Sequence, residues 1–287
     1  MKYQQTLRTP LEITGQALHA GTMVTMRISP QPADTGIYFG RLDLPGGPKV
    51  KAEPRAVIDT KKSVTLGKDG WRISTIEHLM AVFHGLGIDN ALVLVDGDEL
   101  PHGDGSGFFY SQKILQSGIS TQDQPRRYSY IREPLWVEGT VYKQNEPCKA
   151  FIVVLPSQND EFSISFTFTS DHRVTGTQYY QYTQSPEAFM NEIAPARTIA
   201  FTKELEYLRS QGLALGGDLN TAVIVGDEGY NNELRFLDEI VRHKILDIMG
   251  DLYLSGPIAG QLIAIRSGHA LDLELAKKIV QSQSAHT

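Results

Sequence analysis

The first half of the chain changes its hydrophobic period along the sequence. Residues 22–29 alternate, with Val24, Met26 and Ile28 on one face, which predicts a half-buried strand. Ser74-Thr75-Ile76-Glu77 has the spacing of a capping box, and apolar residues at helical spacing follow it, so a helix is predicted from this point to Gly85 and Gly87. A buried strand at 91–95 and a second helix at 111–116 complete this half.

The second half again shows strands followed by helices. Residues 162–168 alternate strictly, with a Phe or Ile at every second position. The predicted elements are strands at 151–155 and 162–168, helices at 185–193, 203–210 and from Glu233 or Phe236 to Tyr253, a strand at 261–265 and a helix at 271–281.

A polar segment separates the two halves. Residues 120–127 (STQDQPRR) contain a proline and almost nothing apolar, so we place a boundary there between domains 1–122 and 127–287. Each half has strands, then a helix with a histidine in its early turns (His78 and His243), then a short buried strand. We therefore expect an α+β fold of two similar domains, each a sheet packed on helices, with both histidine-bearing helices at a shared cleft.

Composition and charge narrow the possible functions. The 287 residues include 27 Lys and Arg against 33 Asp and Glu, a net charge of −6 without any basic run, so we expect no nucleic-acid partner. The chain shows neither a signal-peptide core nor an apolar stretch of membrane-spanning length, so we expect a cytoplasmic protein with no integral membrane segment. Cys148 is the single cysteine, so any metal must take His and carboxylate ligands.

The strongest chemical signal lies in the long helix. His243 and Asp247 are four residues apart and share a helix face, so they can present a ring nitrogen and a carboxylate oxygen to one point, as two ligands of a tetrahedral Zn²⁺ do. Asp251 continues the same stripe one turn later. The alternative is an ordinary hydrogen-bonded pair on a solvated face.

Three further histidines are candidates. His78 can supply a third metal ligand and leave the adjacent Glu77 to activate the attacking water, although a half-buried helical histidine and a capping glutamate explain the same residues. His269 follows a predicted strand on a loop, where it suits acid–base work or is simply solvated. His19 before the first clear strand is equally ambiguous.

Seven short stretches form a set that runs over nearly the whole chain. They are residues 15–21, 74–79 (STIEHL), 85–90, 104–106, 196–198, 241–247 (VRHKILD) and 267–269. In content and order the set resembles the zinc-dependent UDP-3-O-acyl-N-acetylglucosamine deacetylases of lipid A biosynthesis. The resemblance implies two α+β domains with the active site between them, and an insert near 199–225 that forms a tunnel for an acyl chain.

The resemblance also implies roles for individual residues. His78, His243 and Asp247 would hold Zn²⁺, or Fe²⁺ in its place, and Glu77 would be the general base. His269, oriented by Asp251, would stabilise the oxyanion or protonate the leaving amine. Thr198 would hydrogen-bond the oxyanion. The substrate contacts would come from Lys244, His19 and Ile199.

The implied reaction is hydrolysis of the acetamide of UDP-3-O-(3-hydroxyacyl)-N-acetylglucosamine, with release of acetate. The partner would be this acylated UDP-amino-sugar, and we expect a monomer. Three departures from the family pattern are Ile199, residues 101–103 (PHG) and residues 217–221 (GDLNT). They leave open a paralogue that deacetylates another N-acetylated sugar or sugar nucleotide. A second alternative is a non-catalytic paralogue that binds an acylated sugar nucleotide or another protein.

Overall fold

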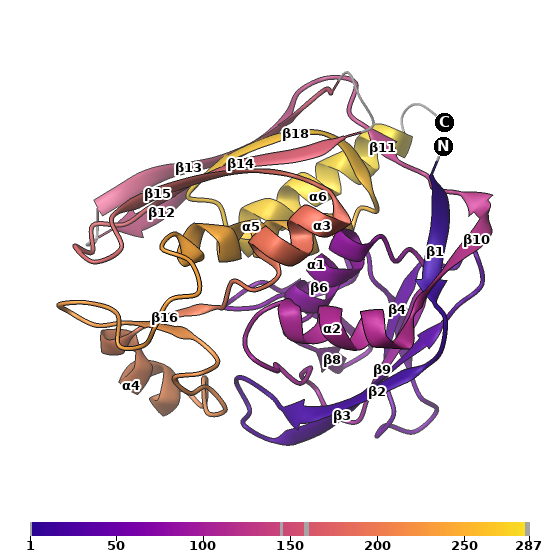
Figure 1. The fold of residues 1–287 in the computed structure, drawn as a ribbon, viewed down its shortest axis with the longest axis horizontal. Helices are drawn as coiled ribbons and strands as arrows, with labels where there is room; N and C mark the ends of the chain where they lie inside the picture. The colour runs from indigo at the N-terminus through magenta and orange to yellow at the C-terminus, as the bar shows by residue number, and fades with distance from the viewer. Residues whose placement is uncertain (1, 144–145, 158–160, 285–287) are drawn as a thin grey trace.

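Two β-sheets face each other across a layer of helices in the computed structural model, which describes residues 2–143, 146–157 and 161–284 (Figure 1). One sheet comes from the first half of the chain and the other from the second half. This confirms the predicted α+β class, with a sheet packed on helices in each half.

The sheet of the first half has five strands. In spatial order they are β2 (Leu11–Gln16), β3 (Met23–Pro30), β9 (Ala91–Val95), β4 (Ile37–Arg41) and β5 (Lys49–Lys51). Only the β9–β4 pair is parallel. As the alternation predicts, Val24, Met26 and Ile28 of β3 are buried.

The sheet of the second half repeats this topology. Its main strands in spatial order are β12 (Leu135–Lys143), β13 (Glu146–Leu155), β18 (Ile258–Ile265), β14 (Phe162–Thr169) and β15 (Thr177–Thr183). Again only the central pair, β18–β14, is parallel among these five, and the short β11 (Ser129–Tyr130) adds a parallel pairing to β18. The equal order and directions support the predicted likeness of the two halves.

Most of the helices lie between the two sheets, and the helix of residues 202–210 lies apart from them (Figure 1). The helices are α1 (Glu77–Leu86), α2 (Phe108–Ser117), α3 (Pro186–Ala188), which continues as a π-helical turn over Phe189–Ile193, α4 (Thr202–Ser210), α5 (Glu239–Tyr253) and α6 (His269–Ser284). Helices α1 and α5 pack on each other. Every residue of α1 is buried, because this helix is covered by both halves.

Smaller elements complete the chain. They are β1 (Tyr3–Leu7) paired with β10 (Ile119–Pro125), the sheet of β6 (Val57–Asp59), β7 (Thr65–Lys68) and β8 (Trp71–Ile73), a 3₁₀ turn at Pro54–Ala56, and the parallel pair β16 (Ile199–Phe201) and β17 (Val223–Val225). The predicted insert is therefore a strand–helix–strand unit with α4 between its strands. Within the described ranges, no helix combines the length and apolar character needed to cross a bilayer.

The capping box predicted at residues 74–77 is wrong. Helix α1 begins at Glu77 without a side-chain cap. The Ser74 hydroxyl donates instead to the carbonyl of Asp98 at 3.1 Å, and the Thr75 hydroxyl donates to Glu99 at 3.1 Å. Ser74 also forms a parallel β-bridge with Glu99, so pairing with a distant segment replaces the local cap.

Three other predicted positions differ. Residues 119–125 form the strand β10, antiparallel to β1, because backbone pairing does not require an apolar sequence. Helix α5 starts at Glu239, later than Glu233 or Phe236, since the carboxylate of Glu239 accepts the backbone N–H of Arg235 and fixes a turn before the helix. His269 is the first residue of α6 and does not lie on a loop.

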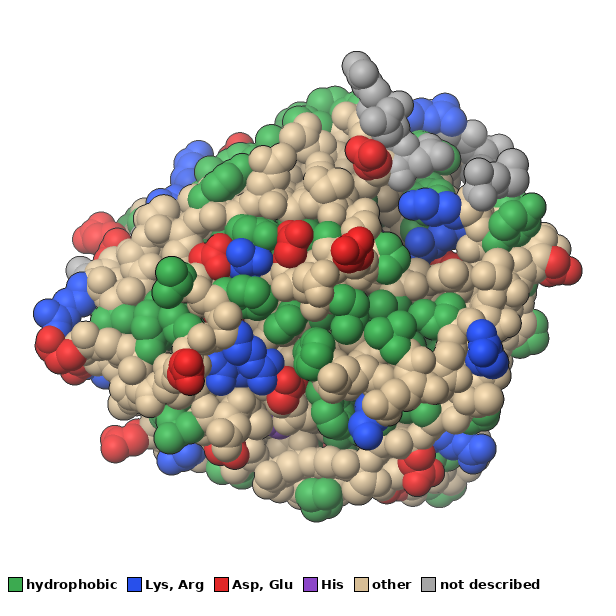
Figure 2. All heavy atoms as spheres, viewed as in Figure 1, with side chains coloured by type: hydrophobic (Ala, Val, Ile, Leu, Met, Phe, Trp, Pro, Cys, Tyr) green, Lys and Arg blue, Asp and Glu red, His purple; other side chains and the backbone are tan. Residues whose placement is uncertain are grey.

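Charged side chains are distributed over the surface. Figure 2 shows Lys and Arg interspersed with Asp and Glu on the face in view, with no continuous basic stripe on that face. Apolar side chains gather in a band across the middle of the same face.

Candidate metal centre and active site

Helices α1 and α5 approach each other closely near the start of α1. A Cβ atom placed on Gly250 of α5 would lie 2.0 Å from the carbonyl oxygen of Glu77 and 3.1 Å from the backbone nitrogen of Ala81. Only glycine permits this distance. The contact brings Glu77 and His78 of α1 beside the histidine-bearing face of α5.

His78, His243 and Asp247 meet at one point. One ligand atom from each lies within 4.8 Å of the others, and all three side chains are buried. Oδ1 of Asp247 is 3.3 Å from Nε2 of His243 and 3.7 Å from Nε2 of His78, and the two rings meet edge to face at 4.9 Å. The structure thus brings together the three residues expected as metal ligands from separate halves of the chain.

The donor atoms of this cluster fit a divalent metal ion. Nδ1 of His243 lies 3.0 Å from the carbonyl oxygen of Ala196, which only accepts, so Nδ1 carries a proton and Nε2 faces the cluster. Burial and the neighbouring His243 lower the pKa of His78 to about 3, so the His78 ring is neutral at neutral pH. Two imidazoles and one carboxylate are a three-ligand set that leaves a coordination position open.

Lys244 holds the remaining oxygen of Asp247. Its Nζ donates to Oδ2 at 2.8 Å, and its side chain is one-quarter exposed. Although burial opposes ionisation of Asp247, His243 and Lys244 hold the pKa of this carboxyl well below its usual range. Asp247 is therefore a carboxylate at neutral pH, with Oδ1 turned to the cluster and Oδ2 to Lys244.

Glu77 lies beside the cluster and is buried. Its Oε2 accepts the backbone N–H of Val64 at 3.0 Å, which fixes the carboxyl group in place. Burial raises the pKa of Glu77 to about 7. A carboxyl group with a pKa near neutrality can accept and return a proton at working pH.

Asp251 and His269 form a hydrogen-bonded pair next to Glu77. Oδ2 of Asp251 lies 2.7 Å from Nδ1 of His269. Burial alone would lower the pKa of His269, but the charge of Asp251 and this hydrogen bond raise it to about 10, so the ring is cationic at neutral pH. Of the stripe predicted on one helix face, His243 and Asp247 therefore belong to the cluster with His78, and Asp251 pairs with His269.

The other expected residues are placed as follows. Thr198 lies two residues after Ala196, whose carbonyl accepts from His243, and the backbone N–H of Thr198 donates to the carbonyl of Gly105 at 2.9 Å. Ile199 begins β16 and packs against a small apolar cluster with Val223 and Ile240.

The His19 imidazole is half-buried between three segments. Its backbone N–H and that of Ala20 donate to the carboxylate of Glu99, and its carbonyl accepts from Leu215 of the insert. Both ring nitrogens are buried without a hydrogen-bond partner among the described residues, and the same holds for His102, one of the residues that depart from the family pattern. Burial lowers the pKa of both imidazoles, so they are neutral.

Sequence reasoning missed two supporting residues. Glu99 is buried and accepts hydrogen bonds from the backbone N–H groups of His19 and Ala20 and from the Thr75 hydroxyl. No local sequence pattern indicates this role. Glu239 is fully buried and pairs with Arg197 at 2.9 Å, which fixes the segment that carries Ala196 and Thr198. The only signal for this pair was that Arg197 lies inside one of the matching stretches.

Comparisons with known proteins agree with this geometry. A model of the UDP-3-O-acyl N-acetylglycosamine deacetylase family matches residues 4–281. Curated UDP-3-O-acyl-N-acetylglucosamine deacetylases are similar over nearly the full length: that of Anaeromyxobacter dehalogenans is 38% identical (99% of this chain, 89% of the relative), and that of Acidithiobacillus ferrooxidans is 40% identical (98% and 91%). The Haemophilus influenzae deacetylase is 39% identical, again over 98% of this chain and 91% of the relative.

Proposed function

The chain belongs to the UDP-3-O-acyl N-acetylglycosamine deacetylase family, and we propose from this that it hydrolyses the acetamide of UDP-3-O-(3-hydroxyacyl)-N-acetylglucosamine, releasing acetate, in lipid A biosynthesis. The observation that carries the proposal for this chain is the buried cluster of His78, His243 and Asp247 with Glu77 beside it. A protein that only binds the substrate requires neither a metal-ligand set nor a buried carboxyl group next to it.

The three ligands of the proposed metal are His78, His243 and Asp247, and Zn²⁺ is the ion that this donor set suits best. A bound divalent ion supplies Lewis acidity, which polarises the acetamide carbonyl and makes water a sufficient nucleophile at neutral pH. Lys244 keeps Asp247 ionised and oriented through its bond to Oδ2, and we assign it contacts to polar groups of the substrate.

Glu77 is the proposed general base. The bond from Val64 to Oε2 fixes the carboxyl group and leaves Oε1 to accept the proton of the attacking water. Its pKa of about 7 permits proton uptake in the first step and proton return in the second.

His269 is the proposed cation of the site. Asp251 keeps the ring protonated through Nδ1, so Nε2–H is free to stabilise the oxyanion or to protonate the leaving amine. Thr198 is proposed to donate its hydroxyl to the same oxyanion. His19 and Ile199, beside the insert of 199–225, are proposed to contact the substrate.

Acetate release from the acylated nucleotide tests the proposal directly. We expect hydrolysis of UDP-3-O-(3-hydroxyacyl)-N-acetylglucosamine and little hydrolysis of UDP-N-acetylglucosamine, which lacks the acyl chain. Glu77→Gln should reduce kcat by at least about 100-fold, as loss of a general base does, and Glu187→Gln at an exposed site should not change it. Full activity of Glu77→Gln would refute the assigned mechanism, and equal rates on both nucleotides would point to a deacetylase of another N-acetylated sugar.

A further inference from the structure

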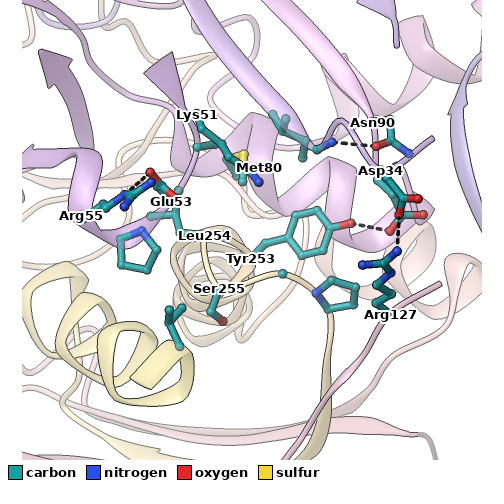
Figure 3. A pocket seen from close by; sticks show the side chains of 18 of the residues that line it. Asp34, Lys51, Glu53, Arg55, Met80, Asn90, Arg127, Tyr253, Leu254 and Ser255 are labelled. Atoms are coloured by element: carbon teal, nitrogen blue, oxygen red, sulfur yellow. Dashed lines mark hydrogen bonds and ion pairs between the residues drawn. The ribbon is translucent and has the colours of Figure 1, made fainter. Parts of the chain in front are cut away.

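Ion pairs flank a cavity of about 710 Å³ at the end of α5. The last turn of the helix lies between Glu53 with Arg55 on one side and Asp34 with Arg127 on the other (Figure 3). Arg55 pairs with Glu53, and Arg127 pairs with Asp34 at 3.2 Å. The carboxylates at this rim therefore have cationic partners, whereas two buried carboxyl groups of α5 and α6 each keep one oxygen without a partner among the described residues.

These two groups are Asp251 of α5 and Asp272 of α6, which are 1% and 0% exposed. Oδ2 of Asp251 lies 2.7 Å from Nδ1 of His269, and Oδ1 of Asp272 accepts the hydroxyl of Ser267. Within the described part of the chain, Oδ1 of Asp251 and Oδ2 of Asp272 have no hydrogen-bond partner. A buried carboxyl oxygen that accepts nothing is costly, so a donor is missing at this place.

The packing of α6 on α5 brings the two groups near each other. His269 and Asp272 are three residues apart in α6 and therefore share one face of the helix. This face is turned to α5, because His269 bonds Asp251 there. After burial, the charge of Asp251 has the strongest influence on the pKa of Asp272, which supports their proximity.

A water-free site does not accommodate two adjacent negative charges. Burial raises the pKa of Asp251, but the charge and the hydrogen bond of His269 favour its ionised form. Burial and the charge of Asp251 raise the pKa of Asp272 to about 7. The Ser267 hydroxyl and the cations His269 and Lys244 act on Asp272 in the opposite direction. Below about pH 7 the pair therefore holds one proton, and this proton resides on Asp272.

We propose that Asp272 is a positioning residue, a neutral carboxylic acid that donates a hydrogen bond from Oδ2 to Oδ1 of Asp251 and so fixes the carboxylate that orients His269. One proton then satisfies both oxygens that lack a partner. The Ser267 hydroxyl fits this assignment, since it donates to Oδ1, the carbonyl oxygen of the neutral acid. The inference rests on the proposed function, in which His269 is the cation of the active site.

Infrared spectroscopy of the full chain tests the protonation directly. The spectrum of the wild type minus that of Asp272→Asn at about pH 6 should contain the carbonyl stretch of a neutral carboxylic acid, because this pH lies about one unit below the pKa of Asp272. The control is Glu274→Gln, which removes an exposed pair partner of Lys277 on the same helix and should show only the loss of a carboxylate. The same result for Asp272→Asn would overturn the proposal.

Two substitutions separate the hydrogen bond from packing. The amide of Asp272→Asn can accept from Ser267 and donate to Asp251, so this variant should keep kcat within about threefold of the wild type. Asp272→Leu has no donor and should lose about tenfold or more in kcat with little change in KM, the effect of losing a hydrogen bond to a charged group. Equal losses in both variants, or wild-type kcat in Asp272→Leu, would overturn the proposal.

The ring of His269 reports the same hydrogen bond without turnover. Its Nδ1 proton, shared with Asp251, should give a downfield NMR resonance that the Asp251→Asn substitution removes. We expect this resonance to stay in place in Asp272→Asn and to move in Asp272→Leu, and an unmoved resonance in Asp272→Leu would overturn the proposal. The infrared and NMR measurements do not require acetate release, so failure of the proposed deacetylation and failure of this hydrogen bond are separate results.

Discussion

Asp251 lies 2.7 Å from Nδ1 of His269 although the two residues stand on different helices, 18 positions apart. Asp251→Asn removes the charge that keeps the ring protonated, and burial then lowers the pKa of His269. We expect the alkaline limb of kcat/KM to move to lower pH, with a loss of about tenfold or more that grows as the pH rises. The pH profile of acetate release measures this.

The control for this variant is Glu274→Gln, an exposed pair partner of Lys277 on α6. It should keep the wild-type profile. A uniform loss at all pH values in Asp251→Asn would mean that Asp251 only supports the structure and does not set the charge of His269.

The contact of Gly250 with Glu77 predicts a coupled loss of stability and metal affinity. Gly250→Ala places a Cβ 2.0 Å from the Glu77 carbonyl oxygen and forces α1 away from α5. We expect the free energy of unfolding to fall by about 2 kcal/mol or more, and metal affinity to fall with it because His78 moves away from His243. Denaturant unfolding and metal titration measure the two effects.

Gly229→Ala is the matched substitution, since no atom lies within 4 Å of a Cβ added there. It should change stability by less than about 1 kcal/mol. Wild-type metal affinity in Gly250→Ala would show that the approach of the two helices does not position the ligands.

The buried His84 is expected to make the free energy of unfolding decrease at acid pH. The ring is buried, stacks on Tyr253 at 4.7 Å, and its Nδ1 lies 3.1 Å from the carbonyl oxygen of Met249. Burial lowers its pKa from 6.5 to about 3, so below about pH 6.5 the unfolded state binds a proton that the folded state excludes. The stability that the folded state keeps with a neutral His84 is therefore fully present above pH 6.5. As the pH falls below this value, the free energy of unfolding decreases by up to about 1.4 kcal/mol per pH unit.

His84→Phe isolates this contribution. The variant is expected to be less stable at neutral pH, because the Met249 carbonyl loses its partner, and to lose less stability than the wild type between neutral pH and about pH 5. Parallel curves of unfolding free energy against pH for the two proteins would contradict the assignment.

Local periodicity predicted the parts of the site that lie on one helix. The spacing of His243 and Asp247 needs only the helical repeat, and α5 presents both to one point, as expected. The likeness of the two halves was also readable, because both carry the same succession of elements, and the two sheets have equal strand orders.

Contacts between distant segments were not predictable in this way. Ser74 and Thr75 have the composition of a helix cap, but both hydroxyls bond to residues 98–99, which local spacing cannot reveal. The same limit applies to Glu99, which accepts the backbone N–H of His19, 80 positions away in the sequence. It also applies to His102, because the burial of its ring nitrogens depends on the tertiary structure. The roles of individual site residues rest on the family likeness and stay predictions.

Metal content and acetate release, measured on the same sample before and after chelation, show whether a metal ion held by His78, His243 and Asp247 carries the reaction. We expect about one divalent ion per chain, loss of acetate release when the ion is removed, and recovery when Zn²⁺ is returned, with neither binding nor recovery in a His243→Ala variant. Undiminished acetate release from metal-free protein would contradict the assignment of His78, His243 and Asp247 as the ligands of a catalytic metal.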